Sequence, residues 1–347
     1  MDFIKIALDA MGGDHAPKIV VEGASLALAQ QPDLFLTLFG DRDKLDPWIK
    51  EYSLPLGRFD IVHTSAYITS DLKPSIALRQ SKGSSMRLAI EHVVKGGSHG
   101  VVSAGNTGAY MAIAKLVFRT IPGIERPAIA SMIPNKKGAS VVLDLGANIQ
   151  CDMQNLIQFA IMGRVYAQGA LGRKNPKVGL LNVGSEDLKG HAYIQEAAQM
   201  LRALDSFIDF HGFIEGNDIG LGTVDVVVAD GFSGNIALKS IEGLAQMLSY
   251  HLKQELSRGI FNKLGALLSF RAFNRFRQKF DPRKYNGAIF IGLNGVAVKS
   301  HGGADGVAFA HAIKEARTMV SHHFNDKIRQ DLEHAENILG SLEILPS

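Results

Sequence analysis

The sequence is poor in several residue types and segments, and each shortage excludes a class of protein. It has one cysteine, Cys151, so a disulfide framework within the chain and a cysteine-rich zinc site are both excluded. No uninterrupted run of about 18 apolar residues is present, so we expect no transmembrane helix. The N-terminal segment has no basic stretch followed by a long apolar one, so we predict no signal peptide. These absences predict a soluble, cytoplasmic protein.

Charge and aromatic content are also low, whereas glycine is abundant. The formal net charge is +3 over 347 residues, which is too small to indicate a nucleic-acid-binding protein, and we expect no nucleic-acid partner. Aromatic residues make up 7% of the chain, and 36 residues are glycine. Many glycines with few aromatics are typical of a fold in which tight turns join strands and helices.

Short apolar runs alternate with helical patterns along most of the chain. The first run covers 3–8 and is followed by a Gly-rich turn and a helical pattern over 18–30. The next run covers 34–39, and Asp41 is placed to cap a helix after it. This alternation predicts βαβ units, and continuous apolar strands indicate a sheet covered on both faces. We predict one α/β domain over 1–347, a three-layer α/β/α sandwich with a mainly parallel sheet.

The turns that follow the strands collect Gly, Asn, Asp and Ser. In an open parallel sheet, ligands bind outside the carboxyl ends of the strands, where helix N-termini attract anions. One such turn is common in proteins, but several at one end of a sheet predict a crevice that binds an anion without a metal or cofactor. The candidate binding residues are Asp9, Gly12, Gly13, Asp14, His15, Ser103, Gly105, Asn106, Thr107, Asp144, Gly146, Asn148, Gly184, Asp230, Gly231, Ser233, Gly234, His301, Gly302, Gly303 and Asp305.

Known phosphate and metal motifs are missing from these turns. No GxxxxGK[ST] segment exists, which excludes a P-loop nucleotide site. The nearest match to GxGxxG has Ser103 where the first glycine is required, which argues against the ordinary dinucleotide fingerprint. His15, His191 and His301 flank the turns without the i, i+4 pairing of a zinc-binding helix. We therefore expect no metal site.

Three further side chains are candidates for catalysis. Lys189 lies close to the start of a predicted helix, where a positive charge opposes the helix dipole, and this unfavourable placement indicates a role. Asn235 ends the turn at 230–235, and its amide could cap the next helix or stabilise an oxyanion. Cys151 could act as a thiol nucleophile, but no base lies beside it, and a single cysteine is more often a small apolar residue.

The segment 256–280 combines basic and apolar residues and contains no acid. One interpretation is a helix that packs on the core and exposes a basic face. The alternatives are docking on anionic lipid or capture of an acidic protein partner, and the sequence does not choose between them. We predict a helical segment over 255–282 that protrudes from the domain. Its docking residues are Ile260, Phe261, Leu264, Leu267, Leu268, Arg271, Arg275 and Arg277.

Taken together, the turns resemble a known family. The matching blocks are DAMGGDHAP at 9–17, SAGNTGA at 103–109, LDLGAN at 143–148, NVGSEDLKG at 182–190, DGFSGN at 230–235 and HGGAD at 301–305. These blocks resemble, in order, those of the phosphate acyltransferase (PlsX) family, and the resemblance covers nearly the whole chain. It implies a fold similar to phosphotransacetylases and the isopropylmalate dehydrogenase group.

The resemblance also implies an activity and partners. The expected reaction transfers a fatty acyl group from acyl-[acyl carrier protein] to inorganic phosphate, which gives an acyl-phosphate for phospholipid synthesis. Lys189 and Asn235 match the lysine and asparagine implicated in family catalysis. A homodimer is expected, as is peripheral association with the membrane or with a glycerol-3-phosphate acyltransferase.

Three alternatives stay open at this point. A phosphotransacetylase that uses acyl-CoA has a related fold, and so does a metal-independent dehydrogenase, since fold alone does not determine function. A non-catalytic membrane scaffold built around 256–280 is the third, but it leaves the Gly-rich turns unexplained.

Overall fold

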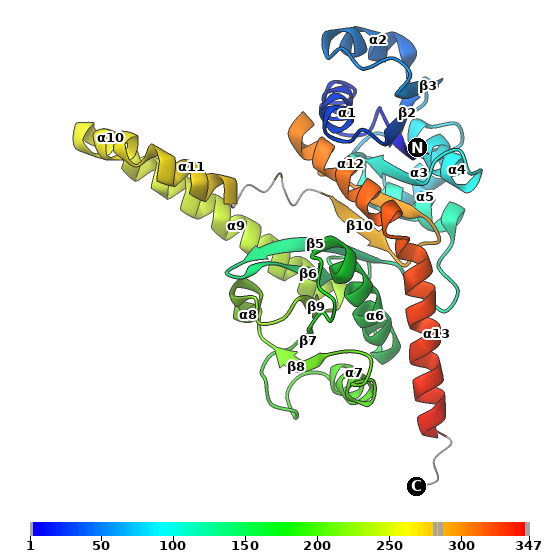
Figure 1. Cartoon of the computed structure of the whole chain (residues 1–347), viewed down its shortest axis with the longest axis vertical. Helices are drawn as coiled ribbons and strands as arrows, with labels where there is room; N and C mark the ends of the chain where they lie inside the picture. The colour runs from blue at the N-terminus through cyan, green and yellow to red at the C-terminus, as the bar shows by residue number, and fades with distance from the viewer. Residues whose placement is uncertain (1–2, 280–282, 284–286, 344–347) are drawn as a thin grey trace.

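The computed structural model describes residues 3–279, 283 and 287–343, without the side chains of 276–279 and 341–343. Its strands form one 11-stranded sheet with the order β3-β2-β1-β4-β11-β10-β5-β6-β9-β7-β8 (Figure 1). The strands are β1 (Ile4–Asp9), β2 (Leu34–Gly40), β3 (Phe59–His63), β4 (Gly100–Ser103), β5 (Ala128–Asn135), β6 (Gly138–Leu143), β7 (Val178–Leu181), β8 (Phe210–Ile214), β9 (Val226–Val228), β10 (Ala288–Ile291) and β11 (Val296–Lys299).

Helices connect most of these strands. They are α1 (Lys18–Gln30), α2 (Arg42–Glu51), α3 (Pro74–Gln80), α4 (Ser85–Val94), α5 (Thr107–Phe118), α6 (Met153–Ala170), α7 (Ala192–Ala203), α8 (Gly216–Leu221), α9 (Gly231–Leu256), α10 (Gly259–Leu268), α11 (Phe270–Lys279), α12 (Gly306–Ser321) and α13 (Phe324–Glu343). The helix predicted over 18–30 is confirmed, and the Asp41 carboxylate accepts a hydrogen bond from the N–H of Asp43 at the start of α2.

The sheet lies between two layers of helices, as predicted. Successive residues of a strand face opposite sides, so Ile6 and Leu8 pack with α1, α6 and α12, whereas Ala7 packs with α4 and α5. A third group of buried apolar residues lies under α8 and the first half of α9. Most strand residues are fully buried on both faces, which explains their continuous apolar runs.

The strand directions divide the sheet into two blocks. β3, β2, β1, β4 and β11 are parallel to one another, and so are β6, β9, β7 and β8. Antiparallel pairs join β11 to β10, β10 to β5 and β5 to β6, so the second block runs opposite to the first. The sheet is mainly parallel, but its strands do not all end at one edge.

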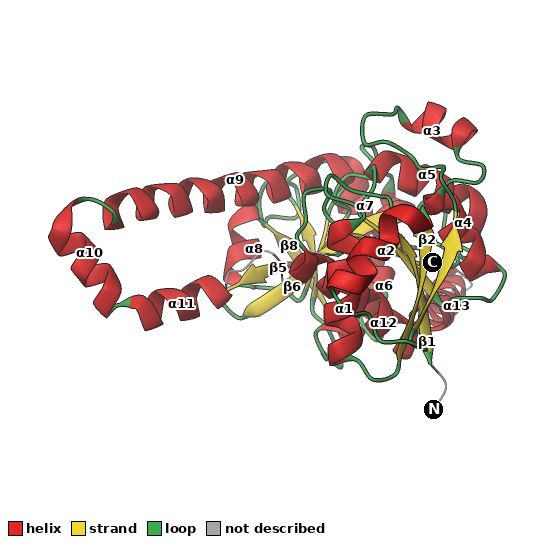
Figure 2. Ribbon diagram, turned by 90° about the horizontal axis from the view of Figure 1, so that it is seen from above, coloured by secondary structure: helices red, strands yellow, loops and turns green. Residues whose placement is uncertain are grey.

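Helices α9, α10 and α11 extend away from the sheet, and the chain turns back at α10 (Figures 1 and 2). Every residue of α9 from Gly243 to Glu255 is exposed. No described residue of α10 is buried, and Phe261 and Leu268 are 85% and 87% exposed. The exposed part therefore begins about three helical turns before residue 255, within α9. Among the described residues, no helix is both long and apolar enough to cross a bilayer.

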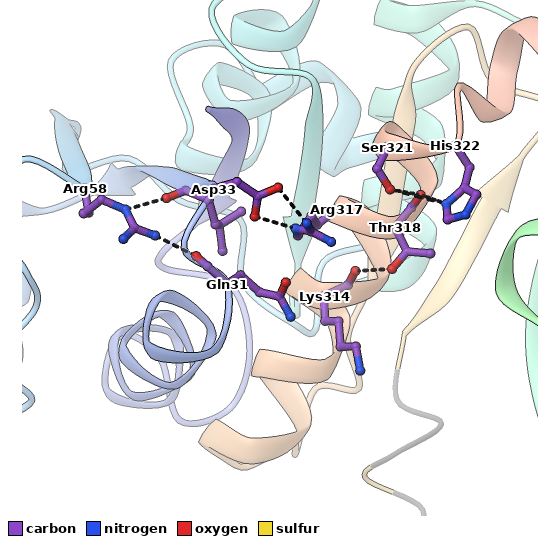
Figure 3. A network of polar contacts seen from close by, with 9 residues as sticks. Gln31, Asp33, Arg58, Lys314, Arg317, Thr318, Ser321 and His322 are labelled. Atoms are coloured by element: carbon purple, nitrogen blue, oxygen red, sulfur yellow. Dashed lines mark hydrogen bonds and ion pairs between the residues drawn. The ribbon is translucent and has the colours of Figure 1, made fainter. Parts of the chain in front are cut away.

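A polar network fastens α12 to the turn before β2. The Arg317 guanidinium donates two hydrogen bonds to the Asp33 carboxylate, at 2.9 and 2.6 Å (Figure 3). On the other side of that turn, Arg58 donates to the carbonyl oxygens of Leu34 and Gln31. The guanidinium of Arg317 holds the pKa of Asp33 below its usual range. This pair fixes the position of α12, whose N-terminus reaches the candidate site.

We predict that Arg317→Ala lowers the free energy of unfolding by about 1–2 kcal/mol, because a two-bond charged pair is lost. The difference should shrink as the pH falls through the folded-state pKa of Asp33, since a carboxylate with a lowered pKa stabilises the fold only while ionised. Thermal unfolding of the wild type and the variant between pH 3 and pH 7 measures how this difference in stability depends on pH. Lys314→Ala, an exposed lysine on the same helix, is the control. Equal melting temperatures for Arg317→Ala and Lys314→Ala would contradict a stabilising role for the Arg317–Asp33 pair.

Candidate active site

Three of the predicted loops meet at the ends of β1, β4 and β11, and we call them the first loop group. Asp9 ends β1, and its carboxylate accepts hydrogen bonds of 2.6 Å from the hydroxyls of Ser85 and Ser103. The N–H of Asp14 donates to the carbonyl oxygen of Gly302, and the N–H of Ser300 donates to that of Ser103. The loops after three different strands are thus joined directly.

Glycine is required where these loops touch. A Cβ at Gly12 would lie 2.4 Å from Oδ2 of Asp9 and 2.8 Å from the N of Gly105. Gly13 has a φ of +109° and lies against Ala104. Complete burial raises the pKa of Asp9, while the two serine hydroxyls counteract part of that rise. The carboxylate therefore stands at the base of the first loop group, enclosed by its donors.

Helix N-termini surround the first loop group. α1, α5 and α12 all begin there, directly after the loops of β1, β4 and β11. Asn106 caps α5 by accepting from the N–H of Ala109, and Asp305 caps α12 by accepting from the N–H of Ala308. Asp305 is also paired with Arg283, at 3.2 Å. Three positive helix ends at one place favour an anion.

The second loop group consists of the loops after β6, β9 and β7, and Asp144 fixes the first of them. Its buried carboxylate accepts five hydrogen bonds of 2.7–3.1 Å, from the N–H groups of Ile129, Gly146, Ala147 and Asn148 and from the Asn148 amide. Burial raises the pKa of Asp144, and these donors counteract the rise in part. The Gly146–Asn148 turn is therefore fixed by a single side chain.

Asp230, rather than Asn235, caps the helix after β9. The Asp230 carboxylate accepts from the N–H of Ser233, and the N–H of Gly231 donates to the carbonyl oxygen of Asn148. Asn235 therefore does not act as the N-cap that the sequence allowed. It lies inside the first turns of α9, exposed and close to Gly146. Its amide is left available for a ligand.

Lys189 lies three residues before α7, on the loop after β7. Its side chain is exposed, and its carbonyl oxygen accepts from the Asn182 amide at 3.0 Å. A Cβ at Gly184 would lie 3.2 Å from Cγ of Lys189, so that glycine gives the lysine room. Among the described residues, the side-chain oxygen of Asn182 is the buried polar atom that lacks a hydrogen-bond partner. The loop thus carries both an exposed cation and a buried acceptor that no described group uses.

Cys151 and Tyr193 complete the second loop group. The hydroxyl of Tyr193 donates to the Asp230 carboxylate at 3.2 Å. Burial, with Asp144 nearby, raises the pKa of Cys151 to about 12. A thiol with that pKa stays protonated at neutral pH, so it is a poor nucleophile. The interpretation of Cys151 as a small apolar residue is the one that the geometry favours.

The strand directions correct the expectation that all these loops lie at one edge of a parallel sheet. Hydrogen bonds gather them into two groups, on blocks of strands that run in opposite directions. Six strand-to-strand steps separate β1 from β9. At the usual twist of roughly 20–25° a step, six steps amount to about 120–150°, so we expect the two opposed carboxyl edges to turn towards the same side of the sheet.

Sequence comparison decides the family. The family model described as "Fatty acid synthesis protein" matches residues 4–327. A phosphate acyltransferase of Rhodospirillum centenum is 52% identical over 341 residues, covering 98% of this chain and 96% of that relative. The chain belongs to the phosphate acyltransferase family. A second member, from Paramagnetospirillum magneticum, is 48% identical and covers 99% of this chain and 97% of its own.

Solved structures of other enzymes share this fold. A phosphotransacetylase of Streptococcus pyogenes superimposes with a TM-score of 0.64 at 16% identity, covering 92% of this chain and 94% of its own. A 4-hydroxythreonine-4-phosphate dehydrogenase of Klebsiella pneumoniae gives 0.53 at 13% identity, covering 92% and 98%. At this level of identity the likeness concerns the fold alone, and it confirms the predicted architecture.

Four residues of the site escaped the sequence-based prediction. Ser85 and Tyr193 bind the carboxylates of Asp9 and Asp230 from distant positions, so no local pattern marks them. Asn182 opens the predicted block at 182–190 without being named as a candidate, and Lys299 ends β11 two residues before the block at 301–305, so position in the sequence was the available signal for both. Of the predicted docking residues, the side chain of Arg277 lies outside the described ones. Within the described residues, no cluster of three His, Cys, Asp or Glu side chains suits a metal ion.

We predict that Gly234→Ala destabilises the protein by about 3 kcal/mol and abolishes activity, because its Cβ would lie 2.0 Å from the carbonyl oxygen of Asp144. Gly243→Ala on the same helix meets no atom within 4 Å and should instead stabilise it by up to about 1 kcal/mol. Chemical denaturation of the wild type and both variants measures their free energies of unfolding. A Gly234→Ala variant with normal stability and activity would show that this close approach is not needed.

Proposed function

We propose that this protein transfers a fatty acyl group from acyl-[acyl carrier protein] to inorganic phosphate. The observations that support the proposal are the three helix N-termini of the first loop group, which suit a phosphate, and the exposed Lys189 and Asn235 of the second loop group. Membership of the phosphate acyltransferase family supports the same chemistry. The product, an acyl-phosphate, would serve phospholipid synthesis.

In the proposed mechanism, phosphate is held by backbone N–H groups and by Lys189. One phosphate oxygen adds to the thioester carbonyl carbon, and the new C–O bond gives a tetrahedral intermediate. The amide of Asn235 stabilises the oxyanion of that intermediate. The intermediate then collapses: the C=O bond re-forms, the C–S bond breaks, and the carrier thiolate leaves and takes up the proton that the hydrogen phosphate releases. Phosphate is already an ionised nucleophile, so positioning and charge stabilisation suffice, and no acyl-enzyme is required.

The alternative acyl donor is acyl-coenzyme A. A phosphotransacetylase shares the fold, but the fold does not identify the donor. The sequence blocks favour the carrier protein, because they resemble those of the phosphate acyltransferase family, for which acyl-[acyl carrier protein] is the expected donor. Rates with carrier-protein and coenzyme A thioesters of the same chain length distinguish the two donors. A homodimer is part of the same proposal, on the strength of the family resemblance.

We predict that Lys189→Ala lowers kcat/KM for phosphate-dependent thiol release by about 100- to 1,000-fold, since it removes a cation that faces developing charge. Thiol release from purified acyl-[acyl carrier protein] is followed with and without phosphate. Lys136→Ala, an exposed lysine on the β5–β6 turn, is the matched control and should behave as the wild type. Near-normal activity of Lys189→Ala would remove Lys189 from the mechanism.

We also propose that α10 docks the protein on anionic lipid. Its apolar side chains Ile260, Phe261, Leu264, Leu267 and Leu268 are at least half exposed, and they stand at the end of a projection rather than against the core. Arg271 and Arg275 are exposed beside them. Apolar side chains next to cations are typical of segments that lie at a membrane interface. An acyl-phosphate product with a long chain would then be released close to the bilayer.

We expect the double variant Phe261→Asp with Leu268→Asp to lose most of its co-sedimentation with vesicles containing anionic lipid, because two charges replace the most exposed apolar contacts. Thiol release in solution should persist. Leu56→Asp, which charges an equally exposed leucine on the body of the protein, should leave vesicle binding intact. If vesicle binding survives in the double variant while the KM for the carrier protein rises, α10 serves the carrier protein instead.

A further inference from the structure

Lys299 is a buried lysine at the centre of the first loop group, and the mechanism above does not use it. It is the last residue of β11, and only 7% of it is exposed. Its ammonium donates to the carbonyl oxygen of Ala104, at 3.2 Å, and to that of Ser300. A buried lysine is uncommon, because removing an ammonium from water is costly unless carbonyls or carboxylates surround it.

The protonation state of Lys299 determines the net charge of the first loop group, because carboxylates surround it. The charged groups that face it are Asp9 at the end of β1 and Asp14 in the following loop, and both favour the ammonium form. Tyr110 of α5 lies near Asp9, and its pKa is raised well above its usual value by burial, so it contributes no charge. With Lys299 neutral, these two carboxylates would leave the first loop group with negative charge. With Lys299 charged, its ammonium offsets part of that negative charge, so the three helix N-termini can attract an anion.

We propose that Lys299 is a positioning residue for the phosphate substrate: its ammonium ties the β4 and β11 loops together, and its positive charge makes the first loop group an anion site. This inference rests on the proposed function and adds to it a second cation, on the opposite block of the sheet from Lys189. Lys299 does not touch the reacting atoms in this account. It acts through the loops whose N–H groups hold the phosphate.

The consequence is a phosphate affinity that falls as the pH rises. Burial lowers the pKa of Lys299 to about 8. The ammonium is therefore largely charged at pH 7.5 and largely neutral at pH 9.0, while phosphate itself is mostly dianionic at both. If the charged form alone binds, the Kd for inorganic phosphate should rise roughly eightfold between these pH values.

The test is calorimetric titration with inorganic phosphate alone, without an acyl donor, at pH 7.5 and pH 9.0. For the wild type we expect the eightfold weakening. Lys299→Met, which keeps the length of the side chain without its charge, should bind at least tenfold more weakly at pH 7.5 and show no further loss at pH 9.0. Lys115→Met, an exposed lysine on α5, should match the wild type at both. Circular dichroism establishes that each variant is folded.

Two results would overturn the inference: a wild-type Kd that is the same at both pH values, or a folded Lys299→Met variant that binds phosphate like the wild type. If Lys299→Met does not fold, Lys299→Arg replaces it, and its lasting charge should abolish the pH dependence. Because no acyl donor is present, a failure here is separate from a failure of acyl transfer. Thiol release that depends on phosphate, with a pH-independent Kd, would retain the proposed function and reject the role of Lys299.

Discussion

A buried carboxylate must be surrounded by donors, and this requirement shapes both loop groups. Asp9 ends β1 and Asp144 directly follows β6, and both are almost completely buried. Asp9 accepts from two serine hydroxyls of other segments, and Asp144 accepts from five N–H donors, one on Ile129 and four in its own following turn. Removing a carboxylate from water is costly unless such bonds replace the lost hydration. The loops are consequently held in place before any substrate arrives.

In the proposed mechanism, acyl transfer to phosphate requires preorganised loops. The nucleophile is already charged, so the protein has to hold it in place and meet the charge that develops on the thioester oxygen. The first loop group supplies three helix ends and a buried ammonium, and the second supplies Lys189 and Asn235. The close approach of α9 to the backbone of Asp144 and Asn148, possible only because Gly234 and Gly231 lack a Cβ, links the second group to the projecting segment.

The sequence allowed much of the fold to be predicted, because local patterns determine it. α1 spans the range predicted from its periodicity, and Asp41 caps α2 as expected. The reversal of the second block was missed, although its cause is local. Lys136 and Lys137 form a two-residue turn between β5 and β6, with Asn135 opposite Gly138. That turn was the available signal for a hairpin within an otherwise parallel pattern.

The sequence predicted which loops form the candidate site, but it did not predict which side chains contact one another there. Each predicted loop does lie at a strand end, since glycine, asparagine and aspartate mark such turns locally. The partners Ser85 and Tyr193 could not be found, because they lie 76 and 37 residues from the carboxylates that they bind. Asp230 and Asn235 both suit a helix cap, and only the observed start of α9 at Gly231 assigns that role to Asp230.

The central claim is that phosphate, rather than water, receives the acyl group. Incorporation of radiolabelled inorganic phosphate into organic-extractable product tests this most directly, because an acyl-phosphate carries the label together with its acyl chain whereas a free fatty acid carries none. The purified protein is incubated with acyl-[acyl carrier protein] and labelled phosphate, and extracted label and free thiol are measured together. The account predicts equal molar amounts of both, and no enzyme-dependent thiol release without phosphate. Thiol release accompanied by free fatty acid alone, or thiol release that does not depend on phosphate, would contradict it.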